Sequence, residues 1–362
     1  MASWVQSIAM RGERDGQFAM RKAVLKSALR IAKAVGLFAL ARRVTARDLR
    51  ILCYHGAELR DEHHFCPGLF ISKETFAARM DFLARHKYPV LSLDEAVASL
   101  DRGGWPNAAT VITIDDGWFG TYKVMAPILW RHGFPATLYI ASYYLEKRTQ
   151  VFNVAADYVL WRARDRTLDP SQISGSLDGS YHLANAEQRA KVRDALVSFA
   201  ERLNGAEERQ ELFRKLCGTL GLDSAEIERE RICAFMSIDE ARDLQSRGID
   251  IQLHTHRHRF PSHDIEAARA EIDENRRVLA QVWGAPRRHF CYPSGEYEKE
   301  QLAWLKPLGI DSATTTKSGF TRPGRSPYEL SRFLDSERVS ALEFEAEMCG
   351  LFELIRRCGY LI

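Results

Sequence analysis

Short apolar runs that stop at ionisable residues recur along this chain. Such a run, when it ends at a turn, predicts a buried β-strand. The clearest examples are residues 49–54, which precede His55, residues 111–114, which precede Asp115 and Asp116, and residues 249–253, which precede His254. The carboxyl ends of parallel strands are where α/β proteins keep their active sites. The pattern therefore predicts a site at one edge of a sheet.

Segments with helical spacing lie between the predicted strands. Residues 122–132 are followed by Gly133, a typical helix end, and residues 134–140 form the next apolar run. Ser237 and Glu240 have the spacing of a capping box, which begins a helix. Strand, helix and strand joined by short connections are the signature of a parallel sheet. The order of elements thus predicts an α/β fold.

Other segments are predicted in the same way. Further strands are expected at residues 289–292, 310–316 and 330–333, and further helices at residues 264–283 and 341–362. His63 and His64 fall in a predicted polar loop.

Composition divides the chain into five parts. Residues 147–231 are highly charged, poor in strand signals and mostly helical in pattern, which indicates an insertion between two parts of the sheet. The insertion either shapes a substrate cleft or forms a solvated outgrowth. The parts are an N-terminal tail and helix (1–48), the first part of the sheet with its helices (49–146), the insertion (147–231), the second part of the sheet with its helices (232–340) and a C-terminal helix (341–362).

Residues 21–43 have the pattern of a basic amphipathic helix. Val24, Ile31 and Val35 recur at helical spacing, and lysine or arginine occupies many of the other positions. Such a helix can lie on an anionic membrane face. The alternative is a helix that docks on its own domain and leaves its basic face in water.

Overall composition narrows the functional class. The 362 residues, 46% of them hydrophobic, suffice for one large core with a subdomain, and a net charge of +3 gives no reason to expect nucleic acid as a partner. Seven scattered cysteines without a CxxC pair favour reduced thiols. Apolar runs are too short to span a bilayer, and a secretion signal is not recognised. We therefore expect a cytoplasmic protein, or one peripheral to the inner membrane face.

His254 and His258 are candidate metal ligands. Two imidazoles four positions apart at the exit of a strand can converge on one ion, and one of the two carboxylates at the end of the strand 111–114, Asp115 or Asp116, can complete the set. Zn²⁺ accepts nitrogen and carboxylate oxygen in a tetrahedral site and keeps one position open for water. His256, which lies between the two histidines, should point elsewhere.

Three motifs in this order resemble those of the polysaccharide deacetylases, the family 4 carbohydrate esterases with a NodB-homology domain. The motifs are Thr113-Ile-Asp-Asp-Gly117, His254-Thr-x-x-His258 and Phe290-Cys-Tyr-Pro-Ser-Gly295. The resemblance covers roughly residues 49–334. It implies a distorted (β/α)7 barrel, to which this chain adds a helical insertion and an N-terminal amphipathic helix.

The resemblance also implies roles for individual residues. Asp116, His254 and His258 would hold Zn²⁺ or another divalent metal such as Co²⁺, and Asp115 would act as the general base. The backbone N–H of Tyr292 would stabilise the oxyanion of the tetrahedral intermediate.

Two departures from the family pattern affect these roles. Many members take a general acid from a C-terminal histidine, but no histidine follows His289. The chain resembles instead the poly-N-acetylglucosamine deacetylases, in which this motif lies on the N-terminal side, and Tyr54-His55 fits that place. The third motif also lacks the arginine that usually steadies the base, and Arg332 is the candidate to replace it.

The expected activity is metal-dependent removal of N-acetyl groups from N-acetylhexosamine units of a polysaccharide. A lipid-linked or nucleotide-linked glycan precursor is the expected substrate form if the protein is not exported. An O-acetyl carbohydrate esterase is an alternative because the same attack by activated water cleaves esters. An inactive carbohydrate-binding protein is another. A phosphohydrolase is disfavoured because paired imidazoles suit Zn²⁺ better than Mg²⁺.

Overall fold

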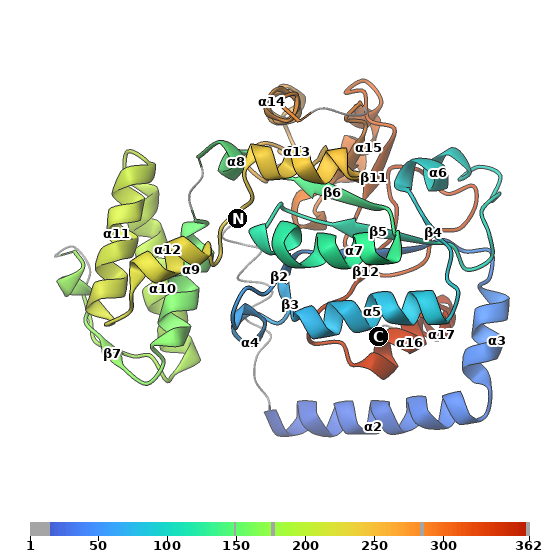
Figure 1. Ribbon diagram of the computed structural model, residues 1–362, viewed down its shortest axis with the longest axis horizontal. Coiled ribbons are helices and arrows are strands. Elements are labelled where there is room, and N and C mark those ends of the chain that lie inside the picture. Colours follow the sequence, from blue (N-terminus) through green and yellow to red (C-terminus); the bar gives the residue numbers. More distant parts are fainter. Residues whose placement is uncertain (1–14, 148–149, 175–177, 283–285, 360–362) are drawn as a thin grey trace.

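A parallel β-sheet forms the centre of the protein. The computed structural model describes residues 15–147, 150–174, 178–282 and 286–359 (Figure 1). The strand order is β11-β10-β9-β6-β5-β1-β12, β4 pairs with the start of β5, and all of these pairs are parallel. The strands are β1 (Arg50–Tyr54), β4 (Val90–Leu91), β5 (Thr110–Ile114), β6 (Ala136–Ile140), β9 (Ile249–Leu253), β10 (His289–Cys291), β11 (Ser312–Thr314) and β12 (Phe333–Leu334).

Residues 330–334 connect the two edges of this sheet. Leu330 forms a parallel bridge with Thr314 at the end of β11, and Phe333 pairs with Leu52 of β1. The curled sheet is thereby closed into a distorted (β/α)7 barrel, which confirms the predicted fold class. The strand predicted at residues 330–333 lies at this closure, although β12 itself begins at Phe333.

The register of the strands aligns their carboxyl ends. Tyr54 lies opposite Ile114, Ile114 lies opposite Leu138, and Ile140 lies opposite Leu253. The residues that follow β1, β5 and β9 therefore emerge at the same end of the barrel. This end is where the sequence predicted the site.

Helices surround the sheet (Figure 1). The predicted capping box at Ser237 and Glu240 begins α13, and Gly133 ends α7 with a positive φ of 64°. The segment before α7, Thr121–Met125, is a π-helix that continues into α7. The barrel helices are α5 (Lys73–Arg85), α6 (Leu93–Ala98), α7 (Ala126–His132), α13 (Ile238–Ser246), α14 (Ile265–Leu279) and α15 (Leu302–Leu305).

A second group of helices extends to one side of the barrel, at the left of Figure 1. It follows the short helix α8 (Tyr143–Lys147) and includes a two-stranded antiparallel ribbon. Its elements are α9 (Phe152–Arg162), β7 (Thr167–Leu168), β8 (Tyr181–His182), α10 (Ala186–Glu201), α11 (Ala206–Thr219) and α12 (Ser224–Glu230).

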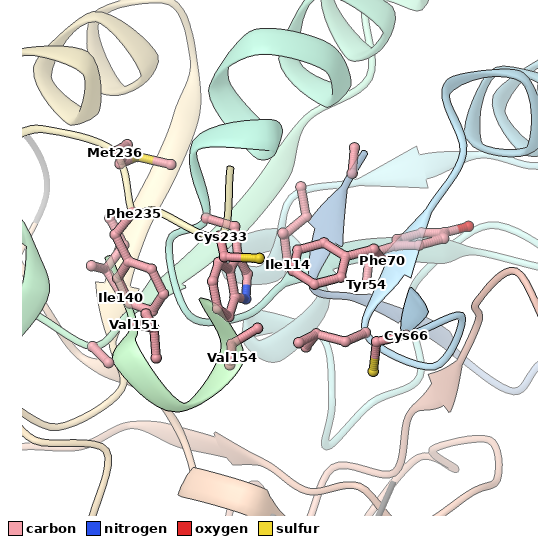
Figure 2. Close-up of a cluster of buried hydrophobic side chains, with 14 of the residues drawn as sticks. Tyr54, Cys66, Phe70, Ile114, Ile140, Val151, Val154, Cys233, Phe235 and Met236 are labelled. Carbon is pink, nitrogen blue, oxygen red and sulfur yellow. The ribbon is translucent and has the colours of Figure 1, made fainter. Parts of the chain in front are cut away.

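This helical group shares its hydrophobic core with the barrel. Figure 2 shows Val151 and Val154 beside Phe235, Ile140 and Ile114, and all of them belong to one buried cluster. Because this apolar surface is continuous, the helices of the insertion pack against the barrel. They do not form a solvated outgrowth.

Two predicted helices are each broken at a glycine. The predicted helix at residues 21–43 is two helices in the structure, α2 (Asp15–Ala34) and α3 (Leu37–Val44). They are separated at Gly36, which has a φ of 85°. Residues 341–359 form α16 (Ala341–Met348) and α17 (Leu351–Arg357), with Gly350 at a φ of 86° between them. A Cβ at Gly350 would lie 2.2 Å from Oγ1 of Thr45, so close packing explains the glycine.

Two smaller expectations differ from the structure. His63 and His64 lie in a short helix, α4 (Glu62–Phe65), where a loop was predicted. The helix predicted to reach residue 283 ends at Leu279, and residue 283 lies outside the described residues. The remaining short elements are β2 (Gly56–Ala57), β3 (Phe70–Ile71) and 3₁₀ turns at Pro170–Gln172, Pro293–Gly295 and Lys299–Gln301. Within the described part of the chain, none of the helices has the length and apolarity needed to span a membrane.

The approach of Gly120 to Ala57 gives a prediction about stability. A Cβ at Gly120 would lie 2.0 Å from the carbonyl oxygen of Ala57, and a backbone atom cannot move away cheaply. Gly120→Ala should therefore lower the free energy of unfolding by roughly 2 kcal/mol or more, measured by urea denaturation.

Gly218→Ala is the matched control. A Cβ at Gly218, which lies within α11, would meet none of the described atoms of other segments within 4 Å. The same change should therefore raise stability there by about 0.5–1 kcal/mol. Equal effects of the two substitutions would contradict the packing explanation.

Candidate metal centre and active site

Asp116, His254 and His258 converge at the carboxyl end of the barrel. Asp116 follows β5, and the two histidines follow β9. The Oδ1 atom of Asp116 lies 3.4 Å from Nε2 of His254 and 3.5 Å from Nε2 of His258. One ligand atom from each residue lies within 4.8 Å of the others. The structure thus brings together the three predicted metal ligands.

Neighbouring groups orient two of these ligands. Nδ1 of His254 lies 2.8 Å from the carbonyl oxygen of Cys291, so Nδ1–H donates there and Nε2 is the ring nitrogen that faces Asp116. The indole N–H of Trp118 donates to Oδ2 of Asp116 at 2.9 Å. Oδ1 of Asp116 is therefore the oxygen that faces the imidazoles.

The backbone is strained at the same place. Asp116, Thr255 and His258 have positive φ angles of 76°, 60° and 56°. Residues other than glycine rarely adopt this conformation, and for a β-branched residue such as Thr255 it is a genuine outlier. Such strain persists only where the surrounding structure imposes it, and it concentrates at functional sites.

The three residues fit a zinc-like ion. Four ligands at about 2.0–2.1 Å in a tetrahedral arrangement lie about 3.3 Å from one another. The separations of 3.4 and 3.5 Å between Asp116 and the two imidazoles are close to this value. A donor set of two nitrogens and one oxygen also leaves a position for water or substrate.

Asp115 is held by Arg332 on the other side of the site. The guanidinium donates from Nη1 to Oδ1 and from Nη2 to Oδ2, both at 2.7 Å, and both side chains are buried. Nε of Arg332 also donates to the carbonyl oxygen of Thr315. The predicted substitute for the missing arginine is therefore in direct bidentate contact with the expected base.

This contact sets the charge of Asp115. Burial by itself would raise the pKa of the carboxyl, but the charge and hydrogen bonds of Arg332 lower it well below its usual range. The thiols of Cys53 and Cys291 lie 3.5 and 3.4 Å from Oδ2, and burial raises the pKa of Cys53 far above its usual value. Asp115 is thus ionised, and the Cys53 thiol beside it is neutral.

His55 faces the same pair of carboxylates. Its Nε2 atom lies 3.9 Å from Oδ2 of Asp115, and its side chain is 5% exposed. Burial lowers its pKa, while the charges of Asp116 and Asp115 act in the opposite direction. His55 is thus placed within reach of the reacting groups, as the sequence predicted, with an imidazole that is mainly neutral.

Tyr292 differs from the other predicted residues. Its backbone N–H donates to the carbonyl oxygen of Thr314 at 3.2 Å, and its hydroxyl donates to the carbonyl oxygen of Tyr328 at 3.1 Å. The N–H that was expected to stabilise an oxyanion is engaged in a bond between β10 and the end of β11. It would have to exchange that partner in order to bind substrate.

Several residues of the site escaped the sequence analysis. Asn275 of α14 accepts from the backbone N–H of His254 at 3.1 Å and donates to the carbonyl oxygen of Ile140 at 3.0 Å. It fixes the end of β9 relative to β6. A buried amide on the inner face of an amphipathic helix was the available signal. Trp118 directly follows Gly117 in the sequence, and nothing in the sequence pattern indicated its hydrogen bond to Asp116.

Aromatic rings separate the metal ligands from a cleft beside the helical group. The ring of Trp118 contacts Phe235 at a centroid distance of 4.7 Å, and Phe235 contacts Tyr144 at 5.2 Å. Tyr144 in turn lines a cleft of about 320 Å³ together with Tyr143. The cleft is also lined by three arginines, Arg209, Arg257 and Arg259, and by one carboxylate, Glu201.

Sequence comparison supports the resemblance seen in the motifs. Residues 223–313 match the sequence model of a family described as polysaccharide deacetylase. The matched region contains His254, His258 and the third motif, whereas Asp115 and Asp116 lie before it. No curated protein matches the chain.

Solved structures share the fold of this chain. The chain is similar to the Streptococcus pyogenes deacetylase PplD in complex with acetate (TM-score 0.55, 16% identity, 83% of this chain and 98% of that one). It is also similar to IcaB from Ammonifex degensii (TM-score 0.53, 16% identity, 83% of this chain and 97% of that one). A de-N-acetylase from Aggregatibacter actinomycetemcomitans is similar as well (TM-score 0.52, 14% identity, 83% of this chain and 99% of that one). The family resemblance predicted from the motifs is confirmed.

The buried ion pair gives a prediction about stability. Arg332→Lys replaces a planar fork with a single ammonium group, so part of the Asp115 carboxylate loses its partner in a dry environment. The free energy of unfolding should fall by about 3 kcal/mol, measured by chemical denaturation.

Arg257→Lys is the matched control for this substitution. Arg257 also pairs with a carboxylate, Glu271, at 2.9 Å, but its side chain is 58% exposed. The same change there should cost less than about 0.5 kcal/mol because water screens the pair. If Arg332→Lys were equally harmless, the ion pair would not hold this end of the barrel together.

Proposed function

We propose that this chain, which carries the family signature and the fold of the polysaccharide deacetylases, removes N-acetyl groups from N-acetylhexosamine units of a glycan. The observation that carries the proposal is the arrangement of Asp116, His254 and His258 around one point, with Asp115 and His55 beside it. A candidate metal-binding triad next to a separate carboxylate that is ionised in the resting state supports hydrolysis by an activated water. Zn²⁺ is the proposed metal, with Co²⁺ as a substitute of similar geometry.

The two carboxylates have different tasks in this proposal. Asp116 is a ligand, since its Oδ1 faces both imidazoles. Asp115 is the base, since Arg332 keeps it ionised and its place beside the triad lets it take a proton from water. A divalent metal bound by the triad lowers the pKa of water and polarises the acyl carbonyl.

His55 is the proposed general acid. When water attacks the amide, Asp115 accepts one proton of that water. The 3.9 Å between Oδ2 of Asp115 and Nε2 of His55 is longer than a hydrogen bond, so in this proposal the proton passes to the imidazole through one bridging water. His55 then gives it to the sugar nitrogen as the carbon–nitrogen bond breaks, so that acetate and an amine are released. A mainly neutral resting imidazole suits this relay because it must receive a proton before it donates one.

The cleft next to the site supports a phosphorylated form of the substrate. Arg257 and Arg259 flank the ligand His258 in sequence, and with Arg209 they give the cleft an excess of positive charge over Glu201. Tyr143 and Tyr144 offer aromatic faces to sugar rings. We therefore propose a lipid-linked or nucleotide-linked glycan precursor as the substrate, whose phosphates contact these arginines.

Acetate release identifies the reaction and the substrate class. The panel should include a nucleotide-linked N-acetylhexosamine, neutral N-acetylated oligosaccharides and O-acetylated sugars, with metal content measured on the same sample. Release from the N-acetylated compounds alone is expected. Release from O-acetylated sugars alone would assign an esterase, and glycan binding without any release would assign a binding protein.

Two substitutions separate metal binding from acid catalysis. Asp116→Ala should lose both metal and activity because it removes a ligand. His55→Ala should keep the metal and lose at least about a hundredfold in kcat, as expected for a general acid. Full activity of His55→Ala would assign the proton transfer to another group, and retained metal in Asp116→Ala would refute the proposed triad.

The arginine-lined cleft gives a separate kinetic prediction. The double variant Arg257→Gln with Arg259→Gln should raise KM about tenfold or more for a nucleotide-linked substrate, because each lost contact to phosphate is charge-assisted. Its KM for a neutral oligosaccharide should stay unchanged. The control is Arg242→Gln with Arg247→Gln, on α13 and at its end, which removes the same charge elsewhere. A similar rise in KM for both substrates would argue against phosphate recognition.

A further inference from the structure

An exposed apolar stripe runs along the two N-terminal helices. Among the described residues, every large hydrophobic side chain that is exposed belongs to α2, to α3 or to the ends of these helices. Four of them are between 64% and 66% exposed, an unusual value for aliphatic side chains that recur on one helix. The stripe consists of Met20, Val24, Ile31, Val35, Leu37, Leu40 and Val44.

The stripe is distinct from the face with which α2 packs on the barrel. Leu25, Leu29 and Ala32 of α2 contact a hydrophobic cluster formed with α16 and α17. Met20, Val24, Ile31 and Val35 are spaced by four and seven residues, so they share another face of the same helix. The helix therefore has two apolar faces, and only one of them is covered by the part of the chain that the structure describes.

Positive charge accompanies the stripe. Residues 20–47 contain eight lysines and arginines and no aspartate or glutamate. Lys33 forms an ion pair with Glu345 of α16, which holds α2 on the protein. Arg21, Arg30 and Arg43 are exposed. A surface that meets the stripe therefore meets an array of cations as well.

We propose that the outer faces of α2 and α3 dock on an anionic lipid surface. Aliphatic side chains can enter the boundary between headgroups and acyl chains, while neighbouring arginines and lysines contact lipid phosphates. A second copy of this chain fits the stripe less well, because pairing two such surfaces would bring like charges together in an interface. Charge complementarity therefore favours lipid.

This docking does not depend on the reaction proposed above. In Figure 1, α2 lies along the lower edge of the molecule and the insertion helices lie at the left. Vesicle binding and acetate release can consequently be measured separately, and a failure of one leaves the other interpretable.

The test is co-sedimentation of the full chain with vesicles. One set contains phosphatidylcholine alone, and the other an equal mixture of phosphatidylcholine and phosphatidylglycerol. Binding should be strong on the anionic vesicles, weak on the neutral ones, and reduced when salt is raised from about 0.1 M to about 1 M, because the Debye length shortens. Equal binding to both vesicles, or none to either, would overturn the proposal.

Variants locate the contact. Val24→Asp with Ile31→Asp should reduce binding to anionic vesicles at least about tenfold, since two aliphatic side chains leave the acyl boundary and two negative charges approach it. Both side chains are exposed, so the unfolding midpoint and acetate release from a soluble substrate should not change. The control is Ala184→Asp with Thr219→Asp, which makes the same charge change at exposed positions of the insertion and should bind normally.

Two further results would contradict docking of the stripe on lipid. If the Val24→Asp, Ile31→Asp variant bound vesicles as well as the unchanged protein, the lipid contact would lie elsewhere. Sedimentation equilibrium in the absence of lipid tests the second possibility. A dimer that dissociates in this variant, together with no binding to vesicles, would identify a second copy of the chain as the occupant of the stripe.

Discussion

The bidentate ion pair between Arg332 and Asp115 is the constraint on which the rest of the site depends. Both groups are buried, where an unpaired charge costs several kcal/mol, so the pair fixes the relative positions of the segments that carry it. Arg332 comes from the segment that closes the barrel, and Asp115 follows β5. The same guanidinium also binds the carbonyl oxygen of Thr315 and the sulfur of Cys291, and so touches the ends of β11 and β10. Arg332 therefore links the segment that closes the barrel to the ionisation of Asp115.

With Asp115 fixed in this way, the backbone can hold its neighbour in an unfavourable conformation. Asp116 has a positive φ, as do Thr255 and His258 on the loop after β9. The cost of these conformations is met by the packing around them, in which Asn275 ties the start of that loop to β6. The result is two adjacent carboxylates that point to different partners, one to a guanidinium and one to two imidazoles.

The sequence by itself determined the type of fold and the chemistry of the site. Alternation of apolar runs with helical segments is a local property, and it predicted the parallel sheet, while the resemblance of the motifs implied that the sheet forms a barrel. Because strands in such a sheet end together, residues far apart in sequence, such as Asp116 and His254, could be placed at one site. The arginine missing from the third motif also led to Arg332 as a candidate, and the structure places its guanidinium on Asp115. Local patterns failed where two predicted helices are broken at glycines with positive φ angles, Gly36 and Gly350, and at Gly350 the close approach of Thr45 explains the glycine.

Only the tertiary structure decided which atoms face one another. Asn275, Trp118 and the thiols beside Asp115 serve the site through contacts between distant segments, and no spacing in the sequence encodes such contacts. The backbone N–H of Tyr292 was assigned to an oxyanion by resemblance, yet its partner is the carbonyl oxygen of Thr314. The amphipathic pattern of α2 likewise left open whether this helix docks on a membrane or on its own domain. Exposure of each side chain depends on what folds against it, and that is settled by the whole chain.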